Sequence, residues 1–199
     1  MAYPSKTGRE AILAAAMEQL AAGGLSGMSL RSLASQLGIA PNALYRYFAD
    51  RAALEAALSA EGARLLLVDL RNAAGKKSPE AAVRAMANAY MRFARERPSI
   101  YEVLMMRCNL SEVDAQAHQA LWIFVVEKVT SIAGNAKARE AAVSLWAFLA
   151  GMAALEQAQV FNEEKPLTSF QFGLNAWLTA ATASMPAGAP SKASLTLSA

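Results

Sequence analysis

The sequence has 199 residues, of which 55% are hydrophobic, and its formal net charge is +3 with an isoelectric point near 9.1. Such a chain is long and apolar enough to bury a sizeable core, and its charge is too small to indicate nucleic acid binding by itself. Residues 1–51 nevertheless carry +2 of that charge, so the positive excess is concentrated in the first quarter of the chain.

The cysteine content and the hydropathy indicate which cellular compartment to expect. The single cysteine, Cys108, excludes an intrachain disulfide, and we recognise no secretory signal, so we expect a reduced, cytoplasmic protein. The longest uncharged stretch, 141–155, has 15 residues. A transmembrane helix needs roughly 20 residues. We therefore expect no membrane association and interpret this stretch as a helix buried inside protein.

Alanine is abundant and β-branched residues are sparse, which predicts an all-α fold of about nine helices. Residues 1–8 form an expected N-terminal arm, and apolar periodicity predicts a first helix over 9–22, ended by Gly23 and Gly24.

The next stretch, 29–51, reads SLRSLASQLGIAPNALYRYFADR and predicts a helix-turn-helix. Ser29 stands at the N-cap position before an apolar helical face, and Gly38 stands where a helix ends in a left-handed residue. Pro41 suits the first turn of the second helix. Leu44 and Phe48 are one turn apart and are expected to face inward. The second helix is therefore shaped to enter a DNA major groove.

Six further helices are expected behind this motif. Asp50 caps a long helix over 51–74, and Ser78 with Pro79 begins a helix that Pro98 stops. Shorter apolar patterns predict helices over 99–107, 112–132, 136–161 and 167–184. The composition of the last residues, 186–199, is typical of a disordered tail.

Residues 9–66 resemble the DNA-binding domain of TetR-type transcriptional repressors. The resemblance lies in the glycine turn, the Leu-Tyr-x-Tyr-Phe run and a basic residue three positions after the Phe. Segments 90–101 and 145–151 resemble a ligand domain named for a Trp-His-Gly motif, in which Trp146 and Gly151 match and Ala150 replaces the histidine. The resemblance implies a DNA-binding domain over 7–67 with its helix-turn-helix at 29–48, and a ligand-binding and dimerisation domain over 68–185.

The family also implies which residues contact DNA. Arginine reads guanine through a bidentate fork and asparagine can pair with adenine, which favours Arg46, Arg31 and Asn42 as base contacts. The other expected contacts hold the phosphates or the groove wall, and the complete predicted set is Ser29, Arg31, Pro41, Asn42, Ala43, Tyr45, Arg46, Tyr47 and Arg51. For the arginines the alternative is a solvated surface charge, for Asn42 a turn cap, and for Tyr45 half-buried packing.

Aromatic and methionine side chains gather in the second half of the chain, where they suit either an ordinary core or a pocket for apolar ligands. The predicted pocket residues are Phe93, Tyr101, Leu104, Met105, Trp122, Trp146 and Met152. The predicted dimer contacts are Phe148, Leu155, Phe170, Leu174 and Trp177.

Three isolated polar residues are candidates for a metal, thiol or ligand site. His118 is the only histidine and lacks metal-ligand neighbours, so we expect it on a solvated helix face. Cys108 is expected to be an inert thiol, and Glu156 either orients a ligand or lies at a helix surface or dimer contact. We find no catalytic constellation and expect no enzyme activity, metal or cofactor.

The sequence therefore predicts a homodimeric repressor that leaves a palindromic operator when a small hydrophobic effector binds. A regulator whose C-terminal domain only dimerises, an activator, and an all-α enzyme or carrier remain the alternatives.

Overall fold

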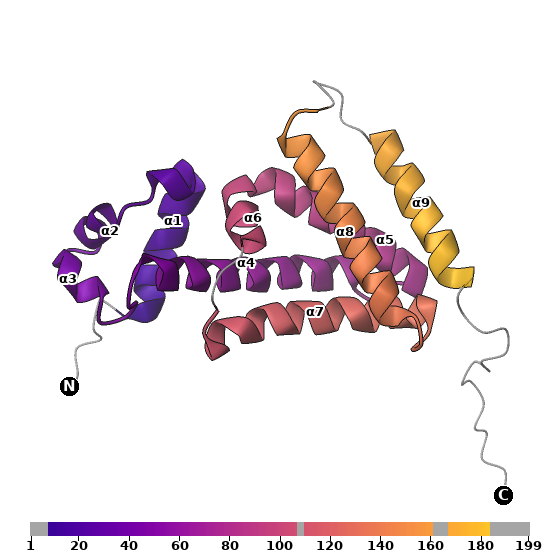
Figure 1. The fold of residues 1–199 in the computed structure, drawn as a ribbon, viewed down its shortest axis with the longest axis horizontal. Helices are drawn as coiled ribbons and strands as arrows, with labels where there is room; N and C mark the ends of the chain where they lie inside the picture. The colour runs from indigo at the N-terminus through magenta and orange to yellow at the C-terminus, as the bar shows by residue number, and fades with distance from the viewer. Residues whose placement is uncertain (1–7, 107–109, 161–166, 184–199) are drawn as a thin grey trace, which may run out of the picture.

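A computed structural model describes residues 8–106, 110–160 and 167–183, and within these ranges the chain forms nine α-helices and no strand (Figure 1). The helices are α1 (Arg9–Gly27), α2 (Leu30–Gln36), α3 (Pro41–Leu44), α4 (Arg51–Ala74), α5 (Pro79–Glu96), α6 (Pro98–Met105), α7 (Glu112–Ala133), α8 (Ala138–Gln157) and α9 (Leu167–Ala183). The all-α prediction is confirmed. The N-terminal arm, Cys108 and the tail 186–199 lie outside the described residues.

The capping signals of the helix-turn-helix act as the sequence predicts. The Ser29 side chain accepts a hydrogen bond from the backbone N–H of Ser32 at 3.0 Å, and Gly38 adopts a φ of 66° in the turn after α2. Asp50 caps α4 by accepting from the N–H of Ala53 at 2.8 Å. These local bonds set the directions in which α2, α3 and α4 leave the turn.

Several helix ends differ from the sequence prediction, and α8 spans Ala138–Gln157 in place of the predicted 136–161. Helix α1 continues to Gly27 beyond a kink at Gly24, whose φ of 65° marks the predicted end. Helix α3 has only four residues, and the backbone after Leu44 closes i→i+3 bonds from Arg46 to Ala43 and from Tyr47 to Leu44. Consecutive bulky residues 45–47 have modest helix propensity, and a tighter turn is a common way for such a helix to end.

Helix α4 connects the two ends of the molecule. It starts beside α1–α3 and runs between α6 and α7 toward the other helices (Figure 1). Gly62 permits the close approach of α6, since a Cβ there would lie 3.3 Å from Leu104 Cβ and 3.4 Å from Ile100 Cγ2. A single helix therefore contacts both α1 and the helices behind it. The predicted domain boundary at residue 67 falls inside this helix and stays a prediction.

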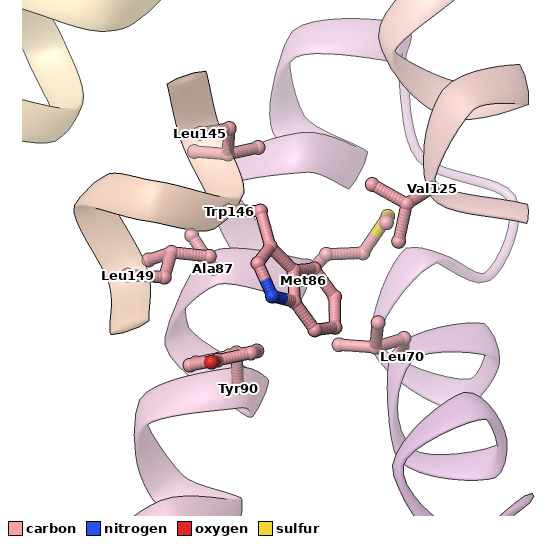
Figure 2. Close-up of a pocket in the computed structure, with 8 residues that line it drawn as sticks. All are labelled: Leu70, Met86, Ala87, Tyr90, Val125, Leu145, Trp146 and Leu149. Carbon is pink, nitrogen blue, oxygen red and sulfur yellow. The ribbon is translucent and has the colours of Figure 1, made fainter. Parts of the chain in front are cut away.

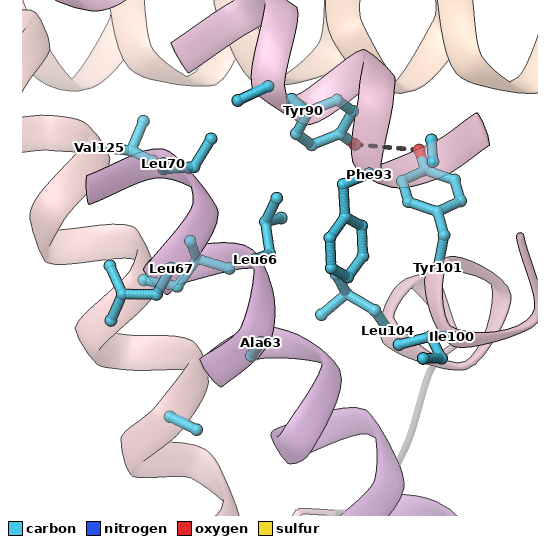
Figure 3. Close-up of a cluster of buried hydrophobic side chains, with 14 of the residues drawn as sticks. Ala63, Leu66, Leu67, Leu70, Tyr90, Phe93, Ile100, Tyr101, Leu104 and Val125 are labelled. Carbon is cyan, nitrogen blue, oxygen red and sulfur yellow. Dashed lines mark hydrogen bonds between the residues drawn. The ribbon is translucent and has the colours of Figure 1, made fainter. Parts of the chain in front are cut away.

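The core behind the motif is built from α4, α5, α6 and α7. Leu66 and Phe93 are fully buried within it. The hydroxyls of Tyr90 and Tyr101 hydrogen-bond each other at 2.9 Å within this core (Figure 3). Pairing the hydroxyls avoids the cost of burying them unsatisfied.

Helices α8 and α9 pack side by side at the end of the molecule away from α1–α3 (Figure 1). Phe148 stacks on Phe170 with ring centroids 6.0 Å apart, and a Cβ at Gly173 would collide with the Phe148 ring. By its length and composition, helix α8 could cross a membrane, and 33% of its most apolar 18-residue stretch is buried inside the protein. Much of its apolar surface is thus left uncovered by the protomer.

Candidate DNA-recognition surface and effector cavity

Six of the predicted DNA contacts lie on the exposed surface at the start of α2 and in or just after α3. We call this the recognition surface and define it by Arg31, Pro41, Asn42, Tyr45, Arg46 and Tyr47, all of which are exposed. Tyr45 retains 52% of its maximal exposure although it is a large aromatic residue. Ala43 is half-buried, and the Ser29 side chain is engaged in capping α2.

Two arginines of the recognition surface have no charged partner in the part of the chain that the structure describes. Neither Arg31 nor Arg46 makes an ion pair or side-chain hydrogen bond to any described residue. An exposed guanidinium without an internal partner can bind a phosphate or the O6 and N7 atoms of guanine at little desolvation cost. This geometry fits the sequence prediction for both residues.

Arg51 is used differently. Its guanidinium donates to the carbonyl of Leu25 at 3.0 Å and of Met28 at 3.4 Å, and it pairs with Glu55 at 2.7 Å. These bonds join the end of α1 to the first turn of α4. The phosphate contact that the resemblance implies for Arg51 therefore competes with a structural role that the sequence did not reveal.

A second arginine links the motif to the rest of the protein. Arg9 on α1 pairs with Asp114 on α7 at 3.2 Å, and its guanidinium lies 5.0 Å from the centre of the Phe48 ring. Asp114 is 3% exposed, and it also accepts from the Ser111 hydroxyl at 2.6 Å. A cavity of about 410 Å³ lies beside this ion pair, between α1, the start of α4 and the start of α7.

A separate cavity of about 240 Å³ lies among α6, α7 and α8. Four predicted pocket residues line it, and the complete lining is Leu104, Met105, His118, Leu121, Trp122 and Trp146. Trp146 also borders a second space of about 10 Å³, which is the size of a single water molecule. On this side its ring lies among Leu70, Met86 and Tyr90 (Figure 2). Its ring thus separates the open cavity from the apolar core.

Three predicted pocket residues are not part of that cavity. Phe93 is fully buried under the guanidinium of Arg97, and Tyr101 is held in the core by Tyr90. Met152 is buried on α8 but does not border the cavity. A ligand contact for these three residues stays a prediction, and their burial shows that apolar composition does not distinguish a core side chain from one that lines the cavity.

The expectation that His118 lies on a solvated helix face is wrong. His118 is half-buried, lines the 240 Å³ cavity, and has its Nε2 atom 3.2 Å from the Ser59 hydroxyl of α4. Burial lowers the pKa of His118 below its ordinary value, opposed by the charge of Asp114 and supported more weakly by Arg64. No local sequence signal identified this pairing, since Ser59 is 59 residues away.

Glu156 is an interhelical ion-pair partner. Its two carboxylate oxygens accept from Arg95 Nε and Nη2 at 2.7 and 2.8 Å, in a bidentate pair between α8 and α5. Hydrogen bonding to Glu156 raises the pKa of Arg95. Its carboxylate is therefore not directed at the cavity, and the ligand-orienting alternative finds no support.

The predicted dimer contacts divide into buried and available residues. Phe170 and Leu174 are 2% and 0% exposed within the protomer, so neither offers a surface to a second copy. Trp177 is half-buried and donates from Nε1 to the Ser144 hydroxyl at 2.9 Å. Phe148 is half-buried, while Leu155 is 40% exposed. The more exposed apolar residues on α8 and α9 are Val143, at 52%, Leu167, at 53%, and Phe172, at 78%.

Two family models match this chain. Residues 12–58 match the bacterial regulatory proteins of the tetR family, and residues 83–177 match the tetracyclin repressor-like C-terminal domain. The first match covers the helix-turn-helix, and the second covers every residue that lines the 240 Å³ cavity. Both parts of the resemblance therefore have independent support.

Individual relatives are more distant. The chain is 24% identical over 158 residues to an uncharacterized HTH-type transcriptional regulator, YobS of Bacillus subtilis, covering 78% of this chain and 83% of that one. It shares its fold with BioQ bound to its double-stranded DNA operator, with a TM-score of 0.65, 21% identity, and coverage of 89% and 99% of the two chains.

The fold is also that of TetR-Q116A from Acinetobacter baumannii in complex with minocycline, with a TM-score of 0.63, 19% identity, and coverage of 87% and 96%. Motif, architecture and family matches agree across both halves of the chain. The protein belongs to the TetR family of DNA-binding transcriptional regulators.

Proposed function

We propose that this regulator is a cytoplasmic homodimeric repressor that leaves a palindromic operator when a small, largely apolar effector binds in the 240 Å³ cavity. The observation that carries the proposal is the position of this cavity. Its wall includes His118, which is bonded to Ser59 of α4, and α4 begins at the recognition motif. A ligand there can change the position of the helix that holds the motif.

The relatives support both halves of the proposal. BioQ binds a double-stranded operator and TetR-Q116A binds minocycline with the same overall fold. In a dimer, two recognition surfaces about 34–36 Å apart would match one turn of DNA. An effector that binds better when α4 is tilted shifts the population away from that spacing, by no more than its difference in affinity for the two states.

The experiment is a selection of bound DNA from a random pool, followed by shift assays on the selected operator with a broad panel of small apolar molecules. We expect an inverted repeat and at least one compound that releases the protein. Failure of every compound would favour a regulator whose C-terminal domain only dimerises. Tighter DNA binding with a compound would instead identify a corepressor.

The exposed apolar face of α8 and α9 is the proposed dimer surface. Phe172, Val143 and Leu155 expose large apolar side chains there, and two such helices from each protomer could form a four-helix contact. Sedimentation velocity at micromolar concentration tests this surface. We expect Phe172→Lys to produce monomers, and Val68→Lys, which changes an equally apolar exposed site on α4, to remain dimeric. A dimeric Phe172→Lys protein with native secondary structure would contradict the assignment.

A further inference from the structure

Two buried polar side chains, Ser59 and Asp114, lie next to His118. Ser59 is 1% exposed and Asp114 is 3% exposed. The other buried residues of the described ranges that carry a polar side-chain group are Tyr90 and Tyr101, whose hydroxyls pair with each other. Ser59 contacts His118 Nε2 at 3.2 Å, and Asp114 lies one turn before His118 on α7. Burying polar groups is unfavourable unless they are paired, so this group marks a polar position in an otherwise apolar region.

The Asp114 carboxylate is satisfied inside the protein. One oxygen accepts from Arg9 at 3.2 Å and the other from the Ser111 hydroxyl at 2.6 Å. His118 differs, because its hydrogen bond uses only Nε2, and no described residue bonds its Nδ1. Of these polar groups, the imidazole is the one that lines the 240 Å³ cavity.

The remaining lining favours a flat, apolar ligand. It consists of the indole rings of Trp122 and Trp146 and the side chains of Leu104, Met105 and Leu121. Indole faces stack on other aromatic rings, and methionine adapts to irregular apolar shapes. A volume of about 240 Å³ lies below the roughly 300–1,000 Å³ of pockets for drug-sized ligands, which requires a compact molecule.

The charge state of His118 selects the polar group of such a molecule. Because burial lowers its pKa, the imidazole is neutral at neutral pH, with one ring nitrogen as donor and the other as acceptor. A hydroxyl both donates and accepts, so it can pair with Nδ1 in either tautomer. A carboxylate only accepts, so it cannot pair with Nδ1 when that atom is the acceptor.

We propose that the effector is a compact fused-ring aromatic molecule with a single hydroxyl that hydrogen-bonds His118. Naming this ligand an effector rests on the proposed function, but its binding to the cavity does not. Ser59 then acts as a positioning residue, since its hydroxyl orients the imidazole from the α4 side.

Calorimetry on the full chain tests the proposal with three probes of matched shape. The probes are 2-naphthol, 2-naphthoate and 2-methylnaphthalene, present in the cell at low concentration while the protein is injected at neutral pH. A hydrogen bond to a buried partner contributes on the order of 1 kcal/mol, and 1.4 kcal/mol is tenfold in affinity. We expect 2-naphthol to bind about fivefold more tightly than 2-methylnaphthalene.

Variants separate the hydrogen bond from simple packing. His118→Leu should abolish the preference for 2-naphthol while retaining 2-methylnaphthalene binding, and His118→Gln should restore part of the preference. Ser59→Ala should reduce the preference by a smaller factor. Gln119→Ala, at the exposed neighbouring position, is the matched control and should change nothing. Circular dichroism and thermal unfolding of each variant verify that it is folded.

Several results would overturn the proposal. These are equal affinity for 2-naphthol and 2-methylnaphthalene, tighter binding of 2-naphthoate, an unchanged preference in His118→Leu, or no binding of any probe. Operator release is measured separately by shift assay. Binding of 2-naphthol without release would leave this inference standing and count against the proposed function.

Discussion

The arginines of the recognition surface and those a few residues away in the same domain have opposite environments. Arg31 and Arg46 extend from the protein with no ion pair or side-chain hydrogen bond to a described residue. Arg51 and Arg9 are held by Glu55 and backbone carbonyls in one case and by Asp114 in the other. The guanidinium group is thus exposed without a described partner at one place and joins segments of the chain at another.

This difference shows that the positive charges of the N-terminal part are not equally available at the surface. Arg9 and Arg51 are paired with nearby carboxylates or backbone carbonyls, so they contribute little to the electrostatic potential at the surface. The unpaired arginines lie where α2 and α3 present their exposed side chains. Charge counting from the sequence assigns all four arginines equal weight, whereas the tertiary contacts separate them.

The strongest test of the comparison is Arg46→Ala. We expect operator affinity to fall by about 1–3 kcal/mol, with relaxed preference at one operator position, because a bidentate guanine contact is lost. Arg92→Ala removes the same charge from an exposed site on α5 and should leave affinity nearly unchanged. Quantitative shift assays on the selected operator and its single-base variants measure both. If the two variants have the same operator affinity and base preference, Arg46 does not contact the operator.

Arg51→Met should act mainly on stability. We expect the free energy of unfolding to fall by about 1–2 kcal/mol, since the carbonyls of Leu25 and Met28 lose their charged donor. Urea unfolding followed by circular dichroism measures this change. If Arg51 instead holds a phosphate, as the family resemblance implies, stability would be retained and the salt dependence of operator binding would weaken by about one unit of slope.

Asp114→Asn tests the link between α1 and α7. The substitution keeps the Ser111 hydroxyl as the α7 cap but removes the charge that pairs with Arg9. Because the Arg9 side chain is 41% exposed, we expect only about 0.5–1 kcal/mol of lost stability. We also expect a smaller effect of any effector on operator affinity. Glu112→Gln, an exposed acid in the same helical turn, is the control.

The smallest expected effect is a pH dependence from His118. Burial lowers its pKa in the folded state below that of the unfolded chain, so the unfolded state binds more protons in acid. Stability should therefore be unaffected above the unfolded pKa near 6.5 and decline as the pH falls below it. Urea unfolding at a series of pH values measures the decline. His118→Gln should show a flatter profile, and identical profiles would exclude this contribution.

Sequence reasoning succeeded where the signal is local. The Ser29 and Asp50 caps, the left-handed Gly38 and the start of α3 at Pro41 all depend on residues within one helical turn of one another. It failed for the length of α3, where the backbone after Leu44 closes i→i+3 bonds and leaves the α-helix. Helix ends are sensitive to small energy differences.

The pocket and the polar pairs depend on contacts between distant segments. Leu104 and Trp146, two of the predicted pocket residues, line a cavity, whereas Phe93 fills the core although it has the same apolar character. His118 had no recognisable role in the sequence because Ser59 comes from another helix. Which face of a helix meets a neighbour is decided by how all the helices pack.

The sequence by itself determined the all-α fold and the helix-turn-helix, because hydrophobic periodicity, caps and glycine turns act over a few residues. The family followed from the resemblance of residues 9–66 and from the matching family models. Tertiary structure alone decided which arginines remain unpaired, which aromatic side chains border open space and where His118 lies. Those properties follow from pairing and burial across segments up to about a hundred residues apart, as in the Arg9–Asp114 ion pair. Solvation and Coulomb energies depend on such distances in space, which a linear pattern does not contain.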